Sequence, residues 1–394
     1  MIGYLLKRAL ASLAALFVFL TFMFFVTEAM IPNDYTTQFA LTMNREVRAE
    51  LAEELGIDLP LWQRYLNWLS RLLSGNLGMS FRGDLVTERL MGLIPYTLLV
   101  FVTGTTIAFV FGLWLGRVTA WRGPGFLSSS AVFGSVALYT TFPPWLAFLV
   151  VYFLVARFAV LPKLAELIGF EPSYNLWQNL RRDIWGDSEL AVPQVALYMF
   201  LTLAGVALLL AAANWLLKRK RRRRLPALLS VPLLVGGWVG SWSVLGFAPQ
   251  AADVLYHSSL PILIFALLAF GETMLVMRTS MMDTLKEDYV TTARAKGLPD
   301  AVVRDRHAAR NALLPVMSRL VVSLPYLLTG LVILEVALEW PGISSAMFDS
   351  FYEQDMPMIM GGLLLVGVIC AVARLVLDVL YATLDPRIRF GMDS

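Results

Sequence analysis

The chain has 394 residues, of which 58% are hydrophobic and only 15% are charged. A soluble chain carries about 25% charged residues, so the composition excludes an ordinary soluble protein. Cys370 is the single cysteine, which excludes a disulfide within the chain and a cysteine cluster for metal. The formal net charge of +3 says little by itself.

Charge-free runs predict the membrane spans. An apolar run of about 18 residues or more is typical of a transmembrane helix. An eighth, shorter run, 320–334, is extended past Glu335 by three apolar residues. We therefore expect an all-α polytopic membrane protein with about eight transmembrane helices. The other seven runs without Asp, Glu, Lys or Arg are 9–27, 90–116, 123–156, 190–217, 225–252, 254–271 and 356–373.

The first predicted element, 1–31, is an N-terminal transmembrane helix. No small-x-small cleavage site follows it, so we expect an uncleaved anchor. Residues 32–89 are expected to be extracytoplasmic. Within them, Leu59–Leu73 places apolar residues at helical spacing, including Trp62 and Tyr65, which favour the headgroup region. This indicates an amphipathic helix on the outer membrane face, with a packing helix of a small outer domain as an equal alternative.

Transmembrane core helices are predicted over 90–162 and again over 254–390. Residues 163–253 are interpreted as an inserted region with two extra transmembrane helices, joined by the basic run Lys218–Arg224. That run is typical of a topology-fixing loop attracted to anionic lipid, and it lacks the aromatic interleaving of a nucleic-acid interface. Gly236 and Gly240 form a GxxxG motif that either packs the hairpin on a neighbour or is incidental.

Lys and Arg mark the cytoplasmic ends of membrane spans. They cluster at alternate loops of the eight-span arrangement, whereas the outer loop 340–356 contains none. The sequence therefore predicts cytoplasmic N- and C-termini. The inner clusters are Lys7 and Arg8, Arg117 and Arg122, the basic run, the polar loop 281–318, and Arg387 and Arg389.

The polar loop 281–318 is predicted to contain two short helices. Leu285, Tyr289 and Ala293 recur at helical spacing and form an apolar stripe on the first. Gly297 follows, where a chain reversal favours glycine because a positive φ costs it no Cβ strain. Pro299 suits the first turn of the second helix.

The second predicted helix has two faces, and Pro315 is expected to mark the return to the membrane. Its cationic face holds Arg304, His307, Arg310 and Asn311. Asp305 breaks the apolar face, either offsetting arginines of the same helix or favouring the positive helix N-terminus. The pattern favours a rigid docking element over a solvated loop. The apolar face holds Ala301, Val302, Ala308, Ala309, Ala312 and Leu313.

Several ordered motifs resemble a known family. The run Asp288–Leu298 reads "DYVTTARAKGL", and "HAARNALLP" ends at Pro315. With "GNLGMSF" (75–81), "WPG" (340–342) and "YATLDPRIR" (381–389), they resemble ABC importer permeases of the oligopeptide/dipeptide (nickel/glutathione) transport family, of the first-permease type. The resemblance covers about 1–162 and 254–390.

This resemblance implies an ABC importer permease fold, with six core helices plus the inserted hairpin. The loop would form coupling helices in a cleft of a cytoplasmic ATPase, although Thr291 replaces the acidic first position of the general signature. The implied partners are a second homologous permease, two ATPase subunits, an extracytoplasmic binding protein and membrane lipid. The implied docking residues are Tyr289, Ala293, Arg294, Ala295, Gly297, His307, Arg310, Asn311 and Pro315.

The implied function is import of di- or oligopeptides across the inner cell membrane, with nickel chelates, glutathione or another small solute as the alternative. ATP and Mg²⁺ would be used by the partner subunits, because the chain lacks GxxxxGK[ST] and is expected to bind no cofactor. It also lacks HExxH and GxSxG, and His257 and His307 lie far apart in the sequence. We therefore predict no catalytic residue and no metal site.

Two other classes of protein remain distant alternatives. A secondary transporter would show internal repeats, and none is convincing. A membrane-embedded enzyme would need polar groups that converge within the bilayer. The candidates are Glu272, Glu335, Arg374 and Asp378, which we instead interpret as pore or interface residues. Arg374 and Asp378 are spaced for an ion pair within one helix.

Overall fold

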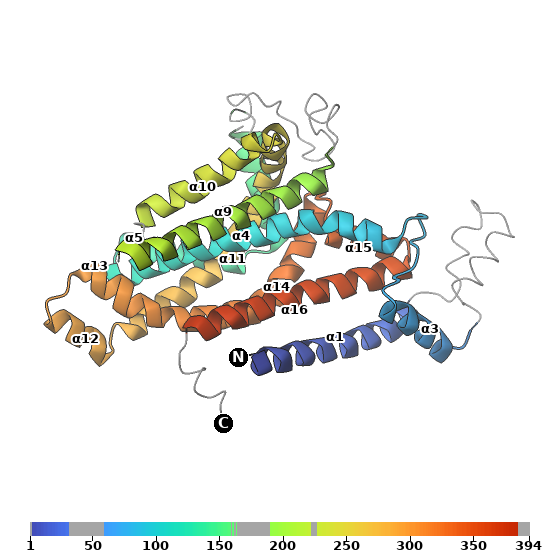
Figure 1. Ribbon diagram of the computed structural model, residues 1–394, viewed down its shortest axis with the longest axis horizontal. Helices are drawn as coiled ribbons and strands as arrows, with labels where there is room; N and C mark the ends of the chain where they lie inside the picture. Colours follow the sequence, from blue (N-terminus) through green and yellow to red (C-terminus); the bar gives the residue numbers. More distant parts are fainter. Residues whose placement is uncertain are drawn as a thin grey trace.

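The computed structural model describes residues 2–30, 59–158, 160, 163, 190–221 and 227–384. Over these ranges the protein is built from helices (Figure 1). Some predictions concern residues outside these ranges. They are the predictions for 32–58, for most of the segment 163–189, for the tip of the basic loop and for the last ten residues.

Five helices in the described part of the chain are long and apolar enough to cross a membrane. They are α1 (Ile2–Met30), α4 (Val86–Arg122), α9 (Val192–Arg221), α11 (Ala248–Thr284) and α16 (Met356–Leu384). A sixth candidate span is a broken pair, α5 (Phe126–Thr140) followed by α6 (Pro143–Val151) and η2 (Tyr152–Arg157). The described residues thus contain five or six candidate spans.

Two of the eight expected spans do not reach the length and hydropathy of a span in the described residues. They correspond to α10 (Ala227–Val244) and to α14 (Ala309–Ala337), whose apolar part is Tyr326–Ala337. The run 123–156 was counted as one span, but it is divided into two helices, and α5 and α6 meet at 114°. Phe142 is in the extended region before Pro143, which disfavours the helical conformation in the preceding residue.

The centre of the molecule is the pair α4 and α11, which make the most extensive helix contact. Glycines on α4 permit it, because a Cβ at Gly116 would lie 2.7 Å from the Met274 carbonyl oxygen of α11. Gly104 and Gly112 face the same helix in the same way. Around this pair, side chains such as Leu99 and Phe265 form the largest buried apolar cluster.

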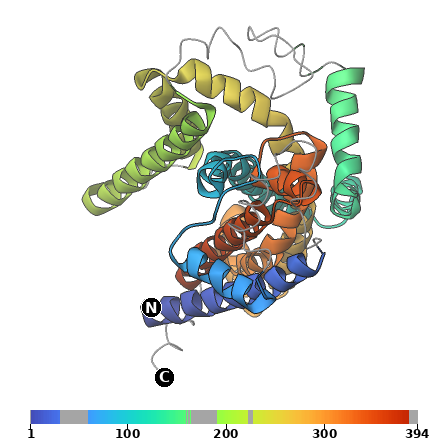
Figure 2. The ribbon, with the colours of Figure 1, turned by 90° about the vertical axis from the view of Figure 1, so that its right-hand side faces the viewer.

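On one side of this core, α9 and α10 form the inserted hairpin (Figure 2). The sequence separated the apolar runs 225–252 and 254–271 at Asp253, whereas the helices divide earlier in the chain. The break occurs at Gly246, which has φ +81°, and α11 runs unbroken from Ala248. Of the two interpretations of the GxxxG motif, the described residues agree with incidental glycines: Gly236 and Gly240 have no heavy atom within 4 Å of an added Cβ, whereas Gly237 faces Val206 of α9.

Helix α1 packs along α16, and α3 (Leu61–Leu73) crosses their ends (Figure 1). Tyr65 and Trp68 of α3 contact the Phe24 ring of α1, at centroid distances of 5.5 and 5.1 Å. Trp62 remains 60% exposed. The predicted amphipathic helix is therefore confirmed, and it both packs on the bundle and keeps an exposed apolar surface.

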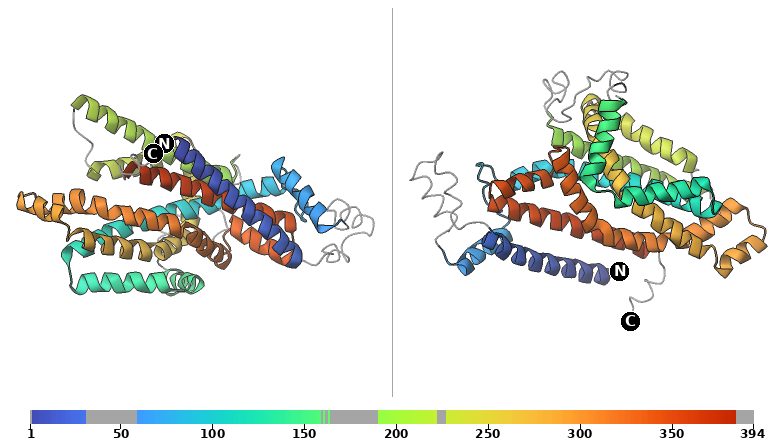
Figure 3. Two further views of the ribbon diagram at one scale, coloured as in Figure 1. Left: turned by 90° about the horizontal axis from the view of Figure 1, so that it is seen from below. Right: turned by 180° about the vertical axis from the view of Figure 1, so that it is seen from behind.

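Different helices lie at the two ends of the bundle. In Figure 1, the helices of the polar loop lie at one end and α3 and α15 (Ile343–Tyr352) at the other. The first turn of α1 and the last described turn of α16 both point toward the polar-loop end, as the two views of Figure 3 also show. The chain thus begins and ends its described helices on the side of the polar loop.

The close contact of α4 with α11 yields a stability prediction. The Gly116→Ala change should destabilise the protein by about 1–3 kcal/mol, because the added methyl meets rigid backbone of α11. Gly92→Ala on the same helix is the matched control, since a Cβ there meets nothing within 4 Å. Thermal unfolding of the purified protein in detergent measures both. Equal melting temperatures for the two variants would contradict this packing.

Candidate docking site

The polar loop folds into α12 (Asp288–Ala295), α13 (Asp300–Val302) and a π-helical turn, η3 (Val303–Ala308), that leads into α14. We call residues 288–312 the docking module. Gly297 has φ +69°, and its N–H donates to the Arg294 carbonyl at 2.9 Å. The predicted reversal at Gly297 is confirmed. Pro299 is the residue that caps α13 rather than a residue of its first turn.

The buried face of the module packs on the last turns of α4 and α11, at the polar-loop end of the bundle. Val290 and Ala293 of α12 lie against this cluster, but Tyr289 is 38% exposed. The expected stripe from Leu285 through Tyr289 is therefore wrong. Leu285 caps α11, and α12 begins only at Asp288, so the two residues do not share a helix.

The second predicted helix differs in register. A π-helical turn adds a residue relative to the α-helical repeat, so Val303 enters the buried face and Ala301 is exposed. Ala308 and Ala312 are buried as predicted. Pro315 does not interrupt the structure: it is an exposed residue inside α14, which continues to Ala337.

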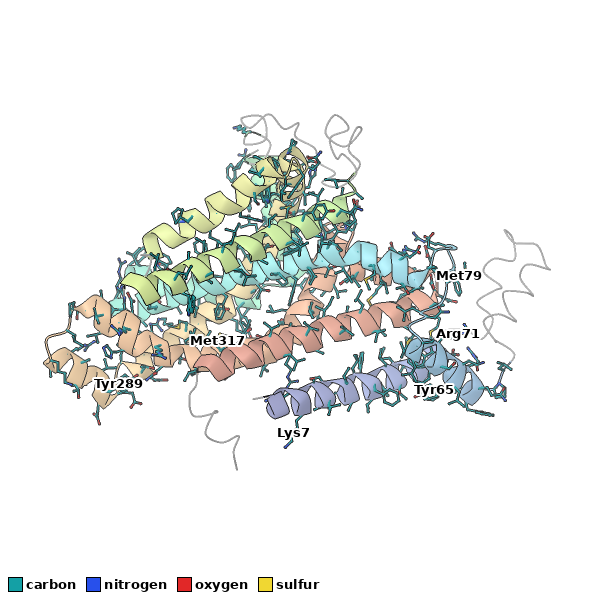
Figure 4. The ribbon with its side chains drawn as sticks, in the orientation of Figure 1. Lys7, Tyr65, Arg71, Met79, Tyr289 and Met317 are labelled. Atoms are coloured by element: carbon teal, nitrogen blue, oxygen red, sulfur yellow. The ribbon has the colours of Figure 1, made fainter. Side chains whose placement is uncertain are left out.

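The outer surface of the module presents most of the predicted docking residues. The Asn311 side-chain amide donates to the Tyr289 hydroxyl at 2.9 Å, which ties α12 to α14. Figure 4 shows Tyr289 at the tip of this end of the molecule. Ala293 is the exception, because it is buried in the module, and His307 is half-buried. Exposed members are Tyr289, Arg294, Ala295, Gly297, Arg310, Asn311 and Pro315.

Two contacts join the module to the last turns of α4. Arg304 binds both oxygens of Asp305, at 2.7 and 2.9 Å, and the Arg117 guanidinium lies 3.4 Å from the same carboxylate. The Arg294 guanidinium lies 5.2 Å from the centre of the Trp121 ring, within cation–π range. Asp305 thus offsets the charge of an arginine in its own helix, which is one of the two interpretations that the sequence left open.

These contacts also set the charge state of Asp305. The hydrogen bond from Arg304, with the charge of Arg117, lowers the pKa of Asp305 below its usual range. Its carboxylate therefore stays ionised at neutral pH. The roles of Arg117 and Trp121 were missed from the sequence, where the cations at 117 and 122 indicated only the inner side of the membrane.

The polar residues predicted for the membrane spans have separate environments. Glu272 accepts a hydrogen bond from Arg319 of α14. Glu335 is only 1% exposed; it accepts hydrogen bonds at 2.8 Å from the Thr97 hydroxyl and the Ser344 N–H. Glu335 therefore fixes the turn into α15 and does not face an open path in this chain.

Arg374 is exposed on α16. The Asp378 side chain lies outside the described ones, so its pairing with Arg374 stays a prediction. In the described part of the chain, no three His, Cys, Asp or Glu side chains are grouped to hold a metal ion.

At the opposite end, the 75–85 segment is bound to the start of α16. The Asp355 carboxylate accepts hydrogen bonds from the Ser80 hydroxyl, the Phe81 N–H at 3.1 Å and the Met358 N–H at 3.2 Å. Arg82 pairs with Glu353, which lowers the pKa of that carboxyl. A pocket beside this segment is lined in part by Arg71 and Met79, both labelled in Figure 4.

Comparison with known proteins matches almost the whole chain. Residues 108–390 match the family described as binding-protein-dependent transport system inner membrane component, and residues 1–98 match its N-terminal domain. The dipeptide transport system permease protein DppB of Escherichia coli (strain K12) is 25% identical over 397 residues, which covers 99% of both chains.

Two further relatives are similar over their full length. The oligopeptide transport system permease protein AppB of Bacillus subtilis (strain 168) is 26% identical over 394 residues, covering 99% of this chain and all of that one. The di/tripeptide transport system permease protein DppB of Pseudomonas aeruginosa (strain UCBPP-PA14) is 27% identical over 387 residues, covering 98% of both. The chain therefore belongs to the binding-protein-dependent transport system inner membrane components: it is a multi-pass inner-membrane permease of an ABC importer, and not an enzyme.

Proposed function

We propose that this permease imports di- or oligopeptides, with the docking module seated in a cytoplasmic ATPase. The observation that carries the proposal is the module itself, which projects short, hydrogen-bonded helices from the inner ends of α4, α11 and α14. A partner that hydrolyses ATP must move the spans through a rigid element, because a loose loop would absorb the motion. The three relatives described above are named as transporters of peptides.

The complete assembly that we propose has five kinds of component. A second homologous permease completes the path, two ATPases bind below and consume ATP with Mg²⁺, and an extracytoplasmic binding protein delivers the peptide above. Membrane lipid surrounds the spans. This chain binds no cofactor in the proposal. Nothing in its described fold indicates nucleic-acid binding.

We further propose that all eight apolar runs cross or enter the membrane, with both termini in the cytoplasm. The described ends of α1 and α16 support this topology, because they point toward the same end as the docking module (Figure 1). Arg117, Arg304 and Arg310 at that end agree with the preference of cytoplasmic loops for cations.

The substrate class is tested with the purified transporter and its binding protein in proteoliposomes. Uptake of radiolabelled dialanine should be competed by unlabelled di- and tripeptides, and not by a nickel chelate or glutathione. Competition by the chelate or by glutathione alone would overturn the peptide assignment and leave the permease function intact.

The docking role is tested at Gly297. The Gly297→Val change places a β-branched residue at φ +69°, a strain of about 1–3 kcal/mol, and should tilt α12 against the partner. We expect peptide uptake to fall at least about tenfold and ATPase subunits to co-purify poorly.

Gly123→Val is the matched control for that experiment. Gly123 also has a positive φ, +75°, and lies in the neighbouring inner turn, outside the docking module. The Gly123→Val variant should keep its ATPases bound. If both variants bind ATPases equally and transport equally, the module is an ordinary loop.

The link to α4 yields another prediction. Arg117→Ala and Asp305→Ala should each reduce peptide uptake per ATP hydrolysed, because each change removes the ion pair between the module and α4. The double variant should be no worse than the poorer single one, since both changes remove one contact. The effect should be modest, at most about 1 kcal/mol, because the pair is partly exposed.

Arg122→Ala is the control, because Arg122 has no ion pair with any described residue. The pH dependence has a definite sign. Since the pKa of Asp305 is lowered, the contact is complete above the usual aspartate pKa, about 3.9, and weakens only as the pH falls through the lowered value. Additive losses from the two alanine changes would contradict a shared contact.

A further inference from the structure

The exposed surface of α14 differs from that of the outer helices. Helices α1 and α5 expose apolar side chains such as Phe22 and Phe126, which suit lipid. Polar groups facing hydrocarbon are costly, and at membrane depth they face a bundle interior or a water-filled cavity. The exposed stripe of α14 is mixed, with Val322 and Tyr326 each 67% exposed, and its charged and hydroxyl members suit a polar path better than lipid. These members are Ser318, Arg319 and Thr329.

Arg319 is the cation of this stripe, and Glu272 is its partner across the bundle. The Arg319 Nε donates to the Glu272 carboxylate. The Arg319 side chain is 49% exposed, whereas that of Glu272 is 12% exposed. The guanidinium also interacts electrostatically with Tyr139 of α5. One side of the Arg319 guanidinium is thus bound by Glu272, and the other side is exposed. Met317, labelled in Figure 4, marks this level of α14.

The level of the pair lies inside the apolar part of the bundle. Glu272 interrupts an apolar run of α11 and precedes Arg278 by six residues, which is a rise of about 9 Å. The neighbouring Gly271 packs against the Ser135 carbonyl of α5, and that helix ends shortly afterwards at Thr140. A break in a helix at membrane depth occurs where the backbone lines a cavity or is buried in protein.

A narrow recess adjoins the pair. Thr105, Thr273 and Ser323 line it together with Glu272 and Arg319. The Thr105 hydroxyl is buried and has no hydrogen-bond partner among the described residues. Three helices, α4, α11 and α14, thus contribute polar groups to a recess whose other lining residues are apolar.

We infer that Arg319 and Glu272 form a binding site in the translocation path, which takes the charged ends of a peptide and which we call the station. Arg319 takes the C-terminal carboxylate, and Glu272 takes the N-terminal ammonium. The inference rests on the proposed peptide substrate. In the empty path the two side chains neutralise each other. A zwitterion brings the same two charges, so it replaces the pair without leaving a charge unpaired.

The peptide must bind only weakly at the station, because transport continues only if the peptide leaves it again. Two charge-assisted hydrogen bonds form with the peptide while the bond between the side chains breaks. The net gain is small, so the peptide leaves readily. A peptide capped at both ends cannot make this exchange, because it would separate the pair and offer no charge in return.

The test is thiol protection at Ser318, which is exposed beside Arg319. The Ser318→Cys change is made in a Cys370→Ala chain, in the complex of both permeases and both ATPases without the binding protein. A water-soluble maleimide should label it. Millimolar dialanine should slow labelling about tenfold, whereas N-acetyl-dialanine amide should not. Adding Arg319→Gln should abolish the protection, and Arg319→Lys should retain part of it.

Phe133→Cys is the control for lipid exposure, because Phe133 lies in the middle of α5, is 77% exposed and should resist the reagent. Failure to label Ser318→Cys, or equal protection by the capped peptide, overturns the station. Peptide uptake by the unaltered transporter is measured in parallel. If it imports dialanine while protection is absent, the station alone is wrong; if it imports no peptide, the proposed substrate is wrong.

Discussion

Helices α4 and α11 approach each other so closely that only glycine fits at the contact. At Gly116 an added Cβ would lie 2.7 Å from a carbonyl oxygen of α11. Such backbone-to-backbone packing leaves no flexible side chain to absorb a displacement. Because both helices end beside the docking module, a movement of the module must move this pair as one unit. The rest of the permease is arranged around that constraint.

Contacts at the two ends of the bundle serve this rigid pair in different ways. At the inner end, Ala120 of α4 and Met277 of α11 share one buried cluster with the module, and Asp305 and Arg294 add polar contacts to α4. At the outer end, Thr97 and Glu335 connect α4 to the turn that precedes α15. The core pair is therefore attached both to the docking module and to the opposite end of the bundle.

Sequence patterns predicted the elements whose cause is local. Gly297 requires a positive φ at a chain reversal, and the amphipathic run at 61–73 forms α3. Patterns failed where tertiary contacts decide. Composition cannot distinguish one straight span from the broken pair α5 and α6. The π-helical turn moved Val303 into the buried face, because helical periodicity assumes a constant repeat.

The same limit applies to the charged groups. Charge counting placed Arg117 on the inner side but could not show that it reaches Asp305, nearly two hundred residues away in the sequence. Likewise Glu272 was recognised as unusual in a span, whereas its partner Arg319 became visible only when α11 and α14 were packed together.

The central claim is that the exposed face of the docking module contacts an ATPase subunit. A photoreactive maleimide attached at Ala295→Cys, in a Cys370→Ala chain, tests it most directly, because Ala295 is exposed on α12. Leu73→Cys, 79% exposed at the opposite end, is the reference. Illumination of the intact transporter should crosslink position 295 to the ATPase, and position 73 should give no such product. Absence of an ATPase crosslink from position 295, while the complex remains intact, would contradict the account.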